Sequence, residues 1–370
     1  MISERSTENA RLAVDMRMLY SSGIGMYLRN LVPWLVKLLP DARFHLLGNT
    51  DMLGRYAWAH RPNVSLHDCR SPIYSVSEQF EIPAKIPKDT DLLWSPHYNI
   101  PLLYRGRLVV TLHDAFHLAM PEYVRGLHKR LYAKAMFSAL RRKAQTIMCD
   151  SQFTADELTR LTRGDRQQLH VVYLGVSEDW FNVQKGESPH NRPYLLCVGN
   201  VKPNKNLVAL VEAFGLIADK VQHDLVIVGK KEGFITGDDR VGAKASRLGD
   251  RVTFTGYVED DLLRRYYANA ACFVFPSFYE GFGLPPLEAM ACGCPVIVSN
   301  AASLPEVCGD AALYCDPHSP EDIADKITSL MSDDALRGKL RRAGFERAAM
   351  YTWDNCARLT VKVLEEALAQ

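Results

Sequence analysis

Short apolar runs alternate with longer amphipathic stretches along almost the whole of this 370-residue chain. Such runs suit strands that are buried on both faces, and the amphipathic stretches have the period of a helix. Alternating strands and helices predict a parallel α/β architecture. In the first half, strands are predicted at 12–15, 43–47, 64–67, 91–94, 108–112, 145–149 and 169–173, with helices at 24–39 and 123–143.

The alternation stops at 176–193, a polar stretch rich in Gly and Pro that we interpret as a linker. The pattern then starts again. We therefore predict two Rossmann-like domains that face each other across a cleft, over residues 1–175 and 190–351, and a last helix at 352–370 that returns to the first domain. The second set of strands is predicted at 194–198, 224–228, 252–255, 272–275 and 295–298, with helices near 205–219, 259–269 and 283–292.

The overall charge argues against a nucleic-acid partner. Lys and Arg number 44 against 43 Asp and Glu, so the net charge of +1 offers no general attraction to a phosphate backbone. Nine scattered cysteines without a C-x-x-C pair indicate reduced thiols and no structural zinc. No run approaches the roughly 18 apolar residues of a membrane span, so we expect a cytoplasmic protein, at most peripheral at the inner face of the membrane.

The segment from Pro276 to Pro295 joins a predicted strand to a predicted helix and carries the most information about function. Its glycines allow backbone amides to approach a ligand, and the positive end of the following helix favours an anion. Glu280 lies on the loop and Glu288 in the helix, so both can face the carboxyl end of the sheet. Taken alone, two such acids are more often a helix cap and a solvated side chain.

The string YEGFGLPPLEAMACGCPVI at 279–297 resembles the E-x7-E motif of retaining glycosyltransferases with the GT-B fold. That family includes glycogen synthases and bacterial polysaccharide mannosyltransferases. The resemblance covers nearly the whole chain in the family's order. It extends to DMRMLYSSGIGMYLRNL at 15–31, LHD at 112–114, CDSQFTADEL at 149–158, VGNVKPNKNL at 198–207 and FTGYVEDDLL at 254–263.

The resemblance implies roles for the residues of this motif. Glu288 would hold the ribose of the nucleotide, and Glu280 would hold the hydroxyls of the donor sugar. Both roles suit carboxylates, which are strong acceptors for paired hydroxyls. The sugar and the phosphates would also bind the backbone amides of Gly281, Phe282, Gly283 and Leu284.

The segment at 198–207 follows a predicted strand and opens a predicted helix. Lys205 matches the family's diphosphate lysine, a fixed cation that stabilises the charge left on the leaving nucleoside diphosphate. The family commonly has an arginine where this chain has Asn200, so one expected positive charge is absent. Lys202 is the candidate replacement, two residues further on. Without the neighbouring motif, Lys205 would be read as a solvated lysine.

In the first domain, the glycine loop at 21–25 and the end of a strand at 112 supply further candidates. The family places such a loop beside the donor phosphate and the acceptor, which implicates Gly23 and Gly25. His113 matches the family's histidine that contacts the donor sugar. Asp114 is either part of the site or a cap for the next segment.

Asp89 and Asp91 form a D-x-D pair, the metal motif of the other major glycosyltransferase fold. Here the pair precedes a buried strand, where acids commonly end a loop, and we reject the metal interpretation. We expect no metal and no cofactor, because Lys205 and helix dipoles would neutralise the diphosphate of the donor substrate.

A basic stretch at 123–144 contains seven cations and no acid. It is either a solvated helix face or a basic amphipathic surface for anionic lipid head groups or a lipid diphosphate acceptor. Leu131, Tyr132 and Phe137 would supply its apolar area. The cations are Arg125, Lys129, Arg130, Lys134, Arg141, Arg142 and Lys143.

These features predict a transferase that moves a hexosyl group from a nucleoside diphosphate sugar to a hydroxyl, with retention at the anomeric carbon. The opening motif looks most like mannosyltransferases that use GDP-mannose to build bacterial surface polysaccharide on a lipid-linked or oligosaccharide acceptor. The alternatives are a transferase for dTDP-rhamnose or a UDP-sugar, a sugar-nucleotide epimerase on the same fold, and a sensor that binds without turnover. A dehydrogenase is disfavoured because Leu28 occupies the third glycine position of the dinucleotide fingerprint.

Overall fold

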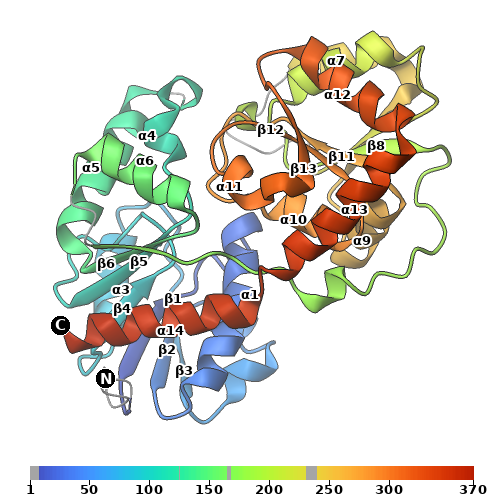
Figure 1. Cartoon of the computed structure of the whole chain (residues 1–370). Coiled ribbons are helices and arrows are strands. Elements are labelled where there is room, and N and C mark those ends of the chain that lie inside the picture. The colour runs from blue at the N-terminus through green and yellow to red at the C-terminus, as the bar shows by residue number, and fades with distance from the viewer. Residues whose placement is uncertain (1–7, 125, 165–167, 231–239) are drawn as a thin grey trace. The chain divides into compact units, whose positions relative to one another are not determined.

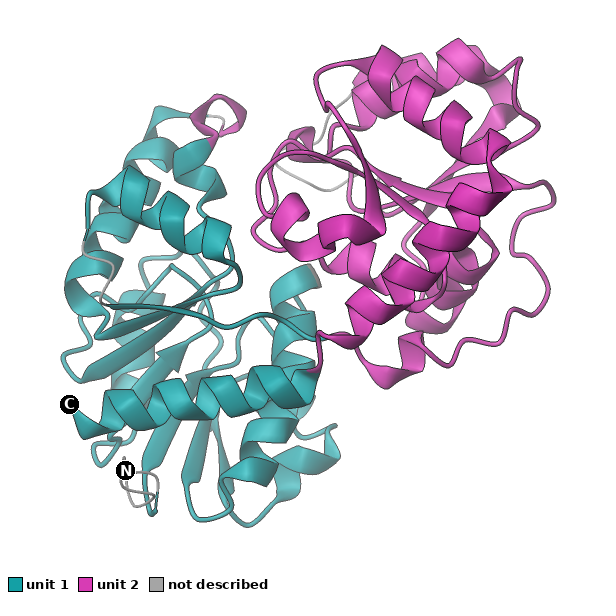
Figure 2. Cartoon of the chain, viewed as in Figure 1, with its two compact units in different colours: residues 1–119, 126–175, 353–370 teal, residues 120–125, 176–352 magenta. Residues whose placement is uncertain are grey.

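The computed structural model describes residues 8–124, 126–164, 168–230 and 240–370. The chain divides into two compact units, shown in different colours in Figure 2. Unit 1 comprises residues 1–119, 126–175 and 353–370, and unit 2 comprises residues 120–125 and 176–352. Each unit contains a parallel sheet with helices between its strands, which confirms the prediction of two Rossmann-like domains.

The sheet of unit 1 has the strand order β3-β2-β1-β4-β5-β6-β7 among the described residues, and every pair is parallel. The direction of winding reverses between β1 and β4. Ligands of such sheets bind at the carboxyl ends of the strands near this reversal. The strands are β1 (Arg11–Asp15), β2 (Arg43–Gly48), β3 (Val64–Asp68), β4 (Leu92–Ser95), β5 (Arg107–Leu112), β6 (Thr146–Cys149) and β7 (Leu169–Val171).

The last helix of the chain belongs to unit 1, where it lies alongside the first helix (Figure 1). The first helix runs unbroken through Pro33. Its buried face, which includes Leu28, Leu31 and Leu35, holds the helix in place. The longer helices of unit 1 are α1 (Ser22–Leu38), α3 (Glu78–Lys85), α5 (Leu127–Lys143), α6 (Gln152–Thr162) and α14 (Trp353–Ala369), with short turns at α2 (Thr50–Leu53) and α4 (Phe116–Ala119).

Helix α5 begins at Leu127, four residues later than the predicted start at 123. A separate 3₁₀ turn at Pro121–Tyr123 precedes it, and Gly126 has φ +95°, a left-handed value that interrupts a helix. Arg125, the first of the predicted basic residues, lies outside the described residues.

The sheet of unit 2 has the order β10-β9-β8-β11-β12-β13 in the part of the chain that is described, again with parallel pairs. Its last strand was not predicted, because its first three residues are only partly buried and do not form a buried apolar run. The strands are β8 (Tyr194–Val198), β9 (Asp224–Val228), β10 (Val252–Gly256), β11 (Cys272–Phe275), β12 (Val296–Ser299) and β13 (Ala312–Cys315).

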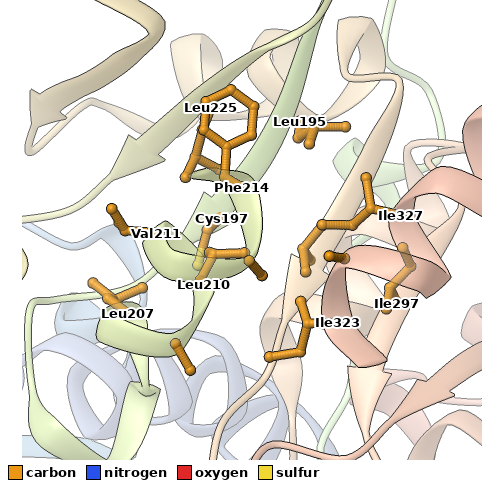
Figure 3. Packing of buried hydrophobic residues seen from close by; sticks show 14 of the residues in the cluster. Leu195, Cys197, Leu207, Leu210, Val211, Phe214, Leu225, Ile297, Ile323 and Ile327 are labelled. Carbon is orange, nitrogen blue, oxygen red and sulfur yellow. The ribbon is translucent and has the colours of Figure 1, made fainter. Parts of the chain in front are cut away.

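The core of unit 2 forms where two helices pack on the sheet and on each other (Figure 3). Leu210 and Phe214 come from the first of these helices, and Ile323 and Ile327 come from the second. These contacts fix the start of the helix at Leu207–Ile217, which follows directly after the loop that carries Lys205. The helices of unit 2 are α7 (Leu207–Ile217), α8 (Arg240–Ala245), α9 (Asp260–Asn269), α10 (Leu284–Ala291), α11 (Leu304–Cys308), α12 (Pro320–Ser332) and α13 (Asp334–Ala349).

Candidate active site

Two loops of unit 2 are joined at the carboxyl edge of its sheet. Strands β8 and β11 are neighbours, so the loops that follow them, at 199–206 and 276–283, leave the sheet side by side. The Asn206 side chain donates to the carbonyls of Pro276 (3.0 Å) and Pro317 (2.6 Å), and the Asn204 side chain donates to the carbonyl of Tyr279 (3.1 Å). These asparagines lie in a motif that the sequence analysis quoted, but their linking role was not predicted.

The joined loops bring Lys205 and Glu280 into contact. Lys205 Nζ lies 2.7 and 2.9 Å from the two carboxylate oxygens of Glu280 and 4.7 Å from the centre of the Phe275 ring. The exposed fractions of the two side chains are only 17% and 13%. Lys205 was expected to hold the diphosphate of the donor and Glu280 its sugar. In this structure the two side chains neutralise each other. Their surroundings are partly desolvated, so the attraction between the two charges is strong.

The glycine-rich loop before α10 is shaped by its neighbours. Ser303 Oγ donates to the carbonyls of Glu280 (2.9 Å) and Phe282 (2.6 Å). Gly283 has φ +125°, and a Cβ at this position would lie 2.9 Å from Leu304 Cδ2, so only glycine fits. The serine was not singled out in the sequence, because its contact spans more than twenty residues.

Two prolines narrow the choice of amides that a ligand could use at this helix. Residues 285 and 286 are both Pro, which has no backbone N–H to donate. The amides of residues 281–284, which the sequence analysis assigned to the sugar and phosphates, thus precede a gap in the run of donors. An anion at this helix start would therefore be bound mainly by backbone amides of the loop, and less by those of the first helical turn.

Glu288 has a partner of its own. It lies in the buried part of α10, where Tyr267 Oη donates to its carboxylate at 3.4 Å. Burial raises the pKa of Glu288 to about 8, and the negative charge of Asp260 adds to the shift. A buried carboxyl with a strongly shifted pKa is a candidate for a functional group.

Asn200, which stands where the family commonly has an arginine, has a structural contact. Its Oδ1 accepts a hydrogen bond from the backbone N–H of Lys230 (3.2 Å). Gly229 crosses Gly199 so closely that a Cβ on Gly229 would lie 2.2 Å from the Gly199 carbonyl oxygen. The exposed Lys230 therefore joins Lys202 as a cation of this loop region, and it was not predicted.

In unit 1, His113 is held by an acid from the neighbouring strand. Strands β5 and β6 pair with Leu112 opposite Cys149, so the next residues, His113 and Asp150, emerge together at the carboxyl edge. His113 Nδ1 lies 2.6 Å from Asp150 Oδ2, and Nε2 lies 3.1 Å from the Pro96 carbonyl oxygen. Both partners are acceptors, so this geometry suits a ring that donates from both nitrogens.

The pKa of His113 follows the same geometry. Burial lowers it, but the negative charge and hydrogen bond of Asp150 outweigh this effect, and the pKa is raised overall. Asp150 was quoted within a motif but not assigned a role. Its position directly after a predicted strand is the feature that could have identified it.

The two glycines of the 21–25 loop differ in what the protein requires of them. Both lie in the first turn of α1, and not in a loop before it. A Cβ on Gly25 would lie 2.4 Å from the Leu19 carbonyl oxygen, whereas a Cβ on Gly23 meets no described atom within 4 Å. Packing within the protein therefore requires a glycine at position 25. It does not require one at position 23.

A buried ionic network lies at the same edge of unit 1. Arg17 contacts Asp15 at 2.7 Å and Glu78 at 2.9 Å, and all three side chains are less than a tenth exposed. Glu78 also accepts from the Asn99 side chain (2.6 Å). The network fixes the loop after β1 to the start of α3.

The remaining acids have structural partners. Asp114 Oδ1 accepts from the amide of Phe116 (2.9 Å), which matches the capping alternative. Asp91 accepts from the amide of Arg11 (2.8 Å), and Asp89 forms an ion pair with the same arginine (3.2 Å). In the described parts of the chain, no group of His, Cys, Asp and Glu is arranged to hold a metal ion. The described helices also include none with the length and apolarity needed to cross a bilayer.

Two parallel α/β units with a lysine–glutamate pair at a glycine-rich helix start define a protein of the GT-B glycosyltransferase class. Two family models match the chain: "Glycosyltransferase Family 4" over residues 21–180 and "Glycosyl transferases group 1" over residues 178–347. The O-antigen chain mannosyltransferase B of Escherichia coli is 34% identical over 279 residues, which are 72% of each chain. The chain belongs to this family of glycosyltransferases.

Solved structures agree with the fold. A sucrose-phosphate synthase from Thermosynechococcus elongatus aligns over 98% of this chain and 100% of its own, with a TM-score of 0.77 and 22% identity. HepE from Anabaena, solved in complex with UDP and glucose, covers 97% of this chain and 100% of its own, with a TM-score of 0.74 and 18% identity. At these identities the likeness concerns the fold alone.

Proposed function

We propose that this glycosyltransferase moves a mannosyl group from GDP-mannose to a hydroxyl of a lipid-linked or oligosaccharide acceptor in bacterial surface polysaccharide synthesis. The E. coli relative, a mannosyltransferase of O-antigen chains, supports the choice of sugar and product. The observation that carries the proposal is the contact between Lys205 and Glu280, which brings a cation and a hydroxyl acceptor to one point. The reaction takes place in the cytoplasm, at the inner face of the membrane.

In the proposed mechanism, the donor separates this ion pair. Lys205 moves to the diphosphate and stabilises the negative charge that grows as the sugar–phosphate bond breaks. Glu280 accepts hydrogen bonds from the sugar hydroxyls, while Glu288 accepts those of the ribose. Amides of residues 281–284 hold the phosphates, and Lys202 supplies the second cation in place of the family's arginine.

The configuration of the anomeric carbon is retained in this proposal. The leaving phosphate takes the proton of the acceptor hydroxyl on the same face of the sugar from which it departs, so no covalent enzyme intermediate is required. In unit 1, His113 contacts the donor sugar and the turn with Gly23 and Gly25 approaches the donor phosphate and the acceptor, as the resemblance implies. Proton magnetic resonance of the product would distinguish retention from inversion directly.

The proposal needs no metal, because Lys205 and backbone amides neutralise the diphosphate. Transfer should therefore continue after exhaustive chelation. Activity that disappears in EDTA and returns with magnesium or manganese would refute this part of the proposal and restore interest in Asp89 and Asp91.

The donor is tested by thermal stabilisation with GDP-mannose, UDP-glucose and dTDP-rhamnose at equal concentrations. GDP-mannose should give the largest increase in Tm, because a ligand stabilises the native state by an amount that grows with the logarithm of the ratio of its concentration to its Kd, and the tightest ligand gives the largest ratio. A larger shift with either other donor would overturn the choice of donor. Incubation of each donor without acceptor completes the test, since an isomerised sugar nucleotide would identify an epimerase.

A further inference from the structure

A cavity of about 500 Å³ lies at the surface of unit 1, between the second half of α1 and the 3₁₀ turn η1 (Ala57–His60). Two tryptophans and two exposed cations line it. Its volume is within the roughly 300–1,000 Å³ that is typical of small-molecule sites. The lining residues are Pro33, Trp34, Lys37, Ala57, Trp58 and Arg61.

Hydrogen bonds hold the two walls of this cavity in place. The Asn63 side chain donates to the carbonyls of Val36 (3.4 Å), Leu39 (3.2 Å) and Ala42 (3.2 Å), which ties the segment after η1 to the end of α1. His60 Nε2 lies 2.7 Å from the Gly54 carbonyl oxygen, which joins η1 to α2. The cavity is therefore formed in the protein alone, so a ligand would cause little ordering of the chain when it binds.

The donor groups of the cavity are available to a ligand. Within the described residues, neither the Trp34 nor the Trp58 indole N–H forms a hydrogen bond, and neither Lys37 nor Arg61 forms an ion pair. Lys37 Nζ lies 4.9 Å from the centre of the Trp34 ring, which holds this cation at the cavity. The cavity thus combines aromatic surface with N–H donors, and its lining includes no carboxylate.

Two tyrosines extend the aromatic surface beyond the cavity. Tyr56 stacks on Trp58, with ring centres 5.3 Å apart and an angle of 27° between the planes. Burial and a hydrogen bond with Tyr20 raise the pKa of Tyr56, and the Tyr20 hydroxyl donates to the Met52 carbonyl (3.3 Å). Tyr20 is itself 50% exposed. We call Tyr20, Tyr56, Trp58 and Trp34 the aromatic strip.

The aromatic strip runs along α1 and away from the proposed site. Tyr20 lies just before the turn with Gly23 and Gly25, at the carboxyl edge of the sheet. Trp34 lies twelve residues after Ser22, which is about 18 Å along the helix axis. Because α1 ends before the amino end of β2, this second position lies toward the opposite edge of the sheet. The strip therefore starts beside the turn that is proposed to approach the acceptor and leads outward from it.

We propose that the aromatic strip binds the sugar units of the acceptor chain that lie behind the accepting hydroxyl. One face of a hexose ring carries C–H groups that pack on an aromatic ring, while its hydroxyl oxygens accept hydrogen bonds from indole N–H, Lys and Arg groups. This inference rests on the proposed transfer to a saccharide acceptor. It makes the ligand of the strip a chain of several sugars and not a single one.

A nucleotide fits the aromatic strip less well. A nucleoside diphosphate would also use aromatic rings and cations, but it is compact, whereas the strip follows α1 over most of the helix. The donor nucleotide also has its own proposed place in unit 2. The sequence analysis counted Phe137 of α5 as exposed apolar area, but this residue lies in the core of unit 1 and offers no second aromatic surface.

Tryptophan fluorescence tests binding directly, because the five tryptophans differ in exposure. Trp94, Trp180 and Trp353 are 1%, 7% and 5% exposed, whereas Trp34 and Trp58 are half-buried. Quenching by iodide therefore reports mainly on the aromatic strip. Without any donor, α-linked mannohexaose should protect the wild type from quenching, and mannose at the same concentration of sugar units should not.

The contribution of the rings is measured by calorimetric titration with mannohexaose. W34A/W58A should raise the Kd by roughly tenfold or more, because tryptophans in a contact surface commonly carry much of the binding energy. F345A is the matched control, since Phe345 is an aromatic residue of unit 2 that is 45% exposed. It should bind mannohexaose as the wild type does.

A second variant keeps the test valid if loss of the half-buried tryptophans disturbs folding. K37Q/R61Q changes only exposed side chains and should raise the Kd by roughly threefold or more, because it removes charged donors to the sugar hydroxyls. K88Q/R105Q is its control, since these exposed cations of unit 1 also form no ion pair among the described residues. Equal weakening in the two charge variants would contradict the role given to the cavity.

Kinetics with acceptors of different length show whether the strip serves the reaction. With mannohexaose as acceptor, W34A/W58A and K37Q/R61Q should raise KM by the same factor as the Kd and leave kcat nearly unchanged. With a short mannoside that cannot reach the strip, neither variant should change KM. An equal change with both acceptors would mean that the substitutions disturb unit 1 as a whole, and it would overturn the proposal.

Other ligands of the aromatic strip would be recognised by the same measurements. Binding of the neutral mannohexaose should persist at high salt, whereas an anionic ligand held by the two cations would be released. Iodide protection by GDP or by anionic vesicles, with none from mannohexaose, would overturn the proposal.

The binding measurements need no donor, so they separate this inference from the proposed function. Mannohexaose binding at the strip without transfer from any sugar nucleotide would refute the transferase proposal and leave the saccharide-binding strip standing. Full transfer to mannohexaose with an unchanged KM in both strip variants would refute the strip and leave the transferase proposal standing.

Discussion

The two units each place a cation and a carboxylate together at the carboxyl edge of a parallel sheet, but the two pairs differ in kind. In unit 2, Lys205 and Glu280 come from neighbouring loops, and both are proposed to bind the donor. In unit 1, His113 pairs with Asp150, whose side chain is only 3% exposed. Only the histidine of that pair is proposed to reach the ligand.

This difference indicates how each pair would behave during turnover. A pair in which both members bind the ligand has to separate when the ligand arrives, so its strength opposes binding. A pair in which only the histidine meets the ligand can remain intact, and its strength holds the histidine ring in place. The two pairs should therefore respond differently when one partner is removed, and this contrast is testable.

The largest effect is expected from the pair in unit 2. K205A and E280Q should each lower kcat/KM for the donor by roughly 10²–10³-fold, because each removes a charged contact to the reacting groups. Thermal melting and circular dichroism should show a retained fold. Initial rates over a range of donor concentrations give the measurement.

The double variant K205A/E280Q tests whether the pair serves the ligand or only the fold. If each residue binds its own part of the donor, the double variant is at least as inactive as either single variant. If the ion pair were only structural, removing both charges would relieve the unpaired charge left by K205A, and activity would partly return.

The pair in unit 1 should give a smaller loss that depends on pH. D150N should reduce turnover by roughly 10–100-fold, as is typical when a group that orients a functional histidine is lost. It should also move the alkaline limb of the pH–rate profile to lower pH, because Asp150 raises the pKa of His113. D114N is the comparison variant: the charge of Asp114 also raises the pKa of His113, but by less than Asp150 does, so D114N should move the alkaline limb in the same direction by a smaller amount.

The same pair makes a signed prediction for stability. The raised pKa of His113 means that its pairing with Asp150 stabilises the fold fully below the unfolded pKa of 6.5. This contribution is lost as pH rises through the higher pKa of the folded state. The difference in Tm between wild type and D150N should therefore shrink as the pH is raised. A constant difference from pH 6 to pH 9 would contradict the role given to His113.

Glu288 extends the comparison, because in the described parts of the chain its carboxyl group forms no ion pair and accepts a hydrogen bond from Tyr267. Its pKa of about 8 lies above the unfolded value of 4.5, so ionisation opposes folding increasingly between these pH values. E288Q should gain Tm relative to wild type as pH rises from 5 to 8, with little further change above that. The same variant should bind GDP more weakly at pH 8. A gain in Tm at pH 5 as large as at pH 8 would exclude this explanation.

The sequence predicted the strands better than the contacts between loops. Strands β8 and β11 were located within a residue because buried parallel strands are apolar runs, whereas β13, of which only the last residue is fully buried, was missed. The contact between Lys205 and Glu280 depends on β8 lying beside β11, and that between His113 and Asp150 on β5 lying beside β6. Strand order is set by packing of the whole unit and leaves no local mark in the sequence.

The smallest effect concerns the two glycines at the start of α1 in unit 1. G25A should lower the free energy of unfolding by roughly 1–3 kcal/mol, because its Cβ would overlap the Leu19 carbonyl oxygen. G23A should leave Tm almost unchanged, since its Cβ meets no described atom within 4 Å. If a donor phosphate approaches this turn, G23A should still raise KM for the donor. An unchanged KM in a fully folded G23A protein would remove Gly23 from the proposed site and confine donor contacts in unit 1 to His113.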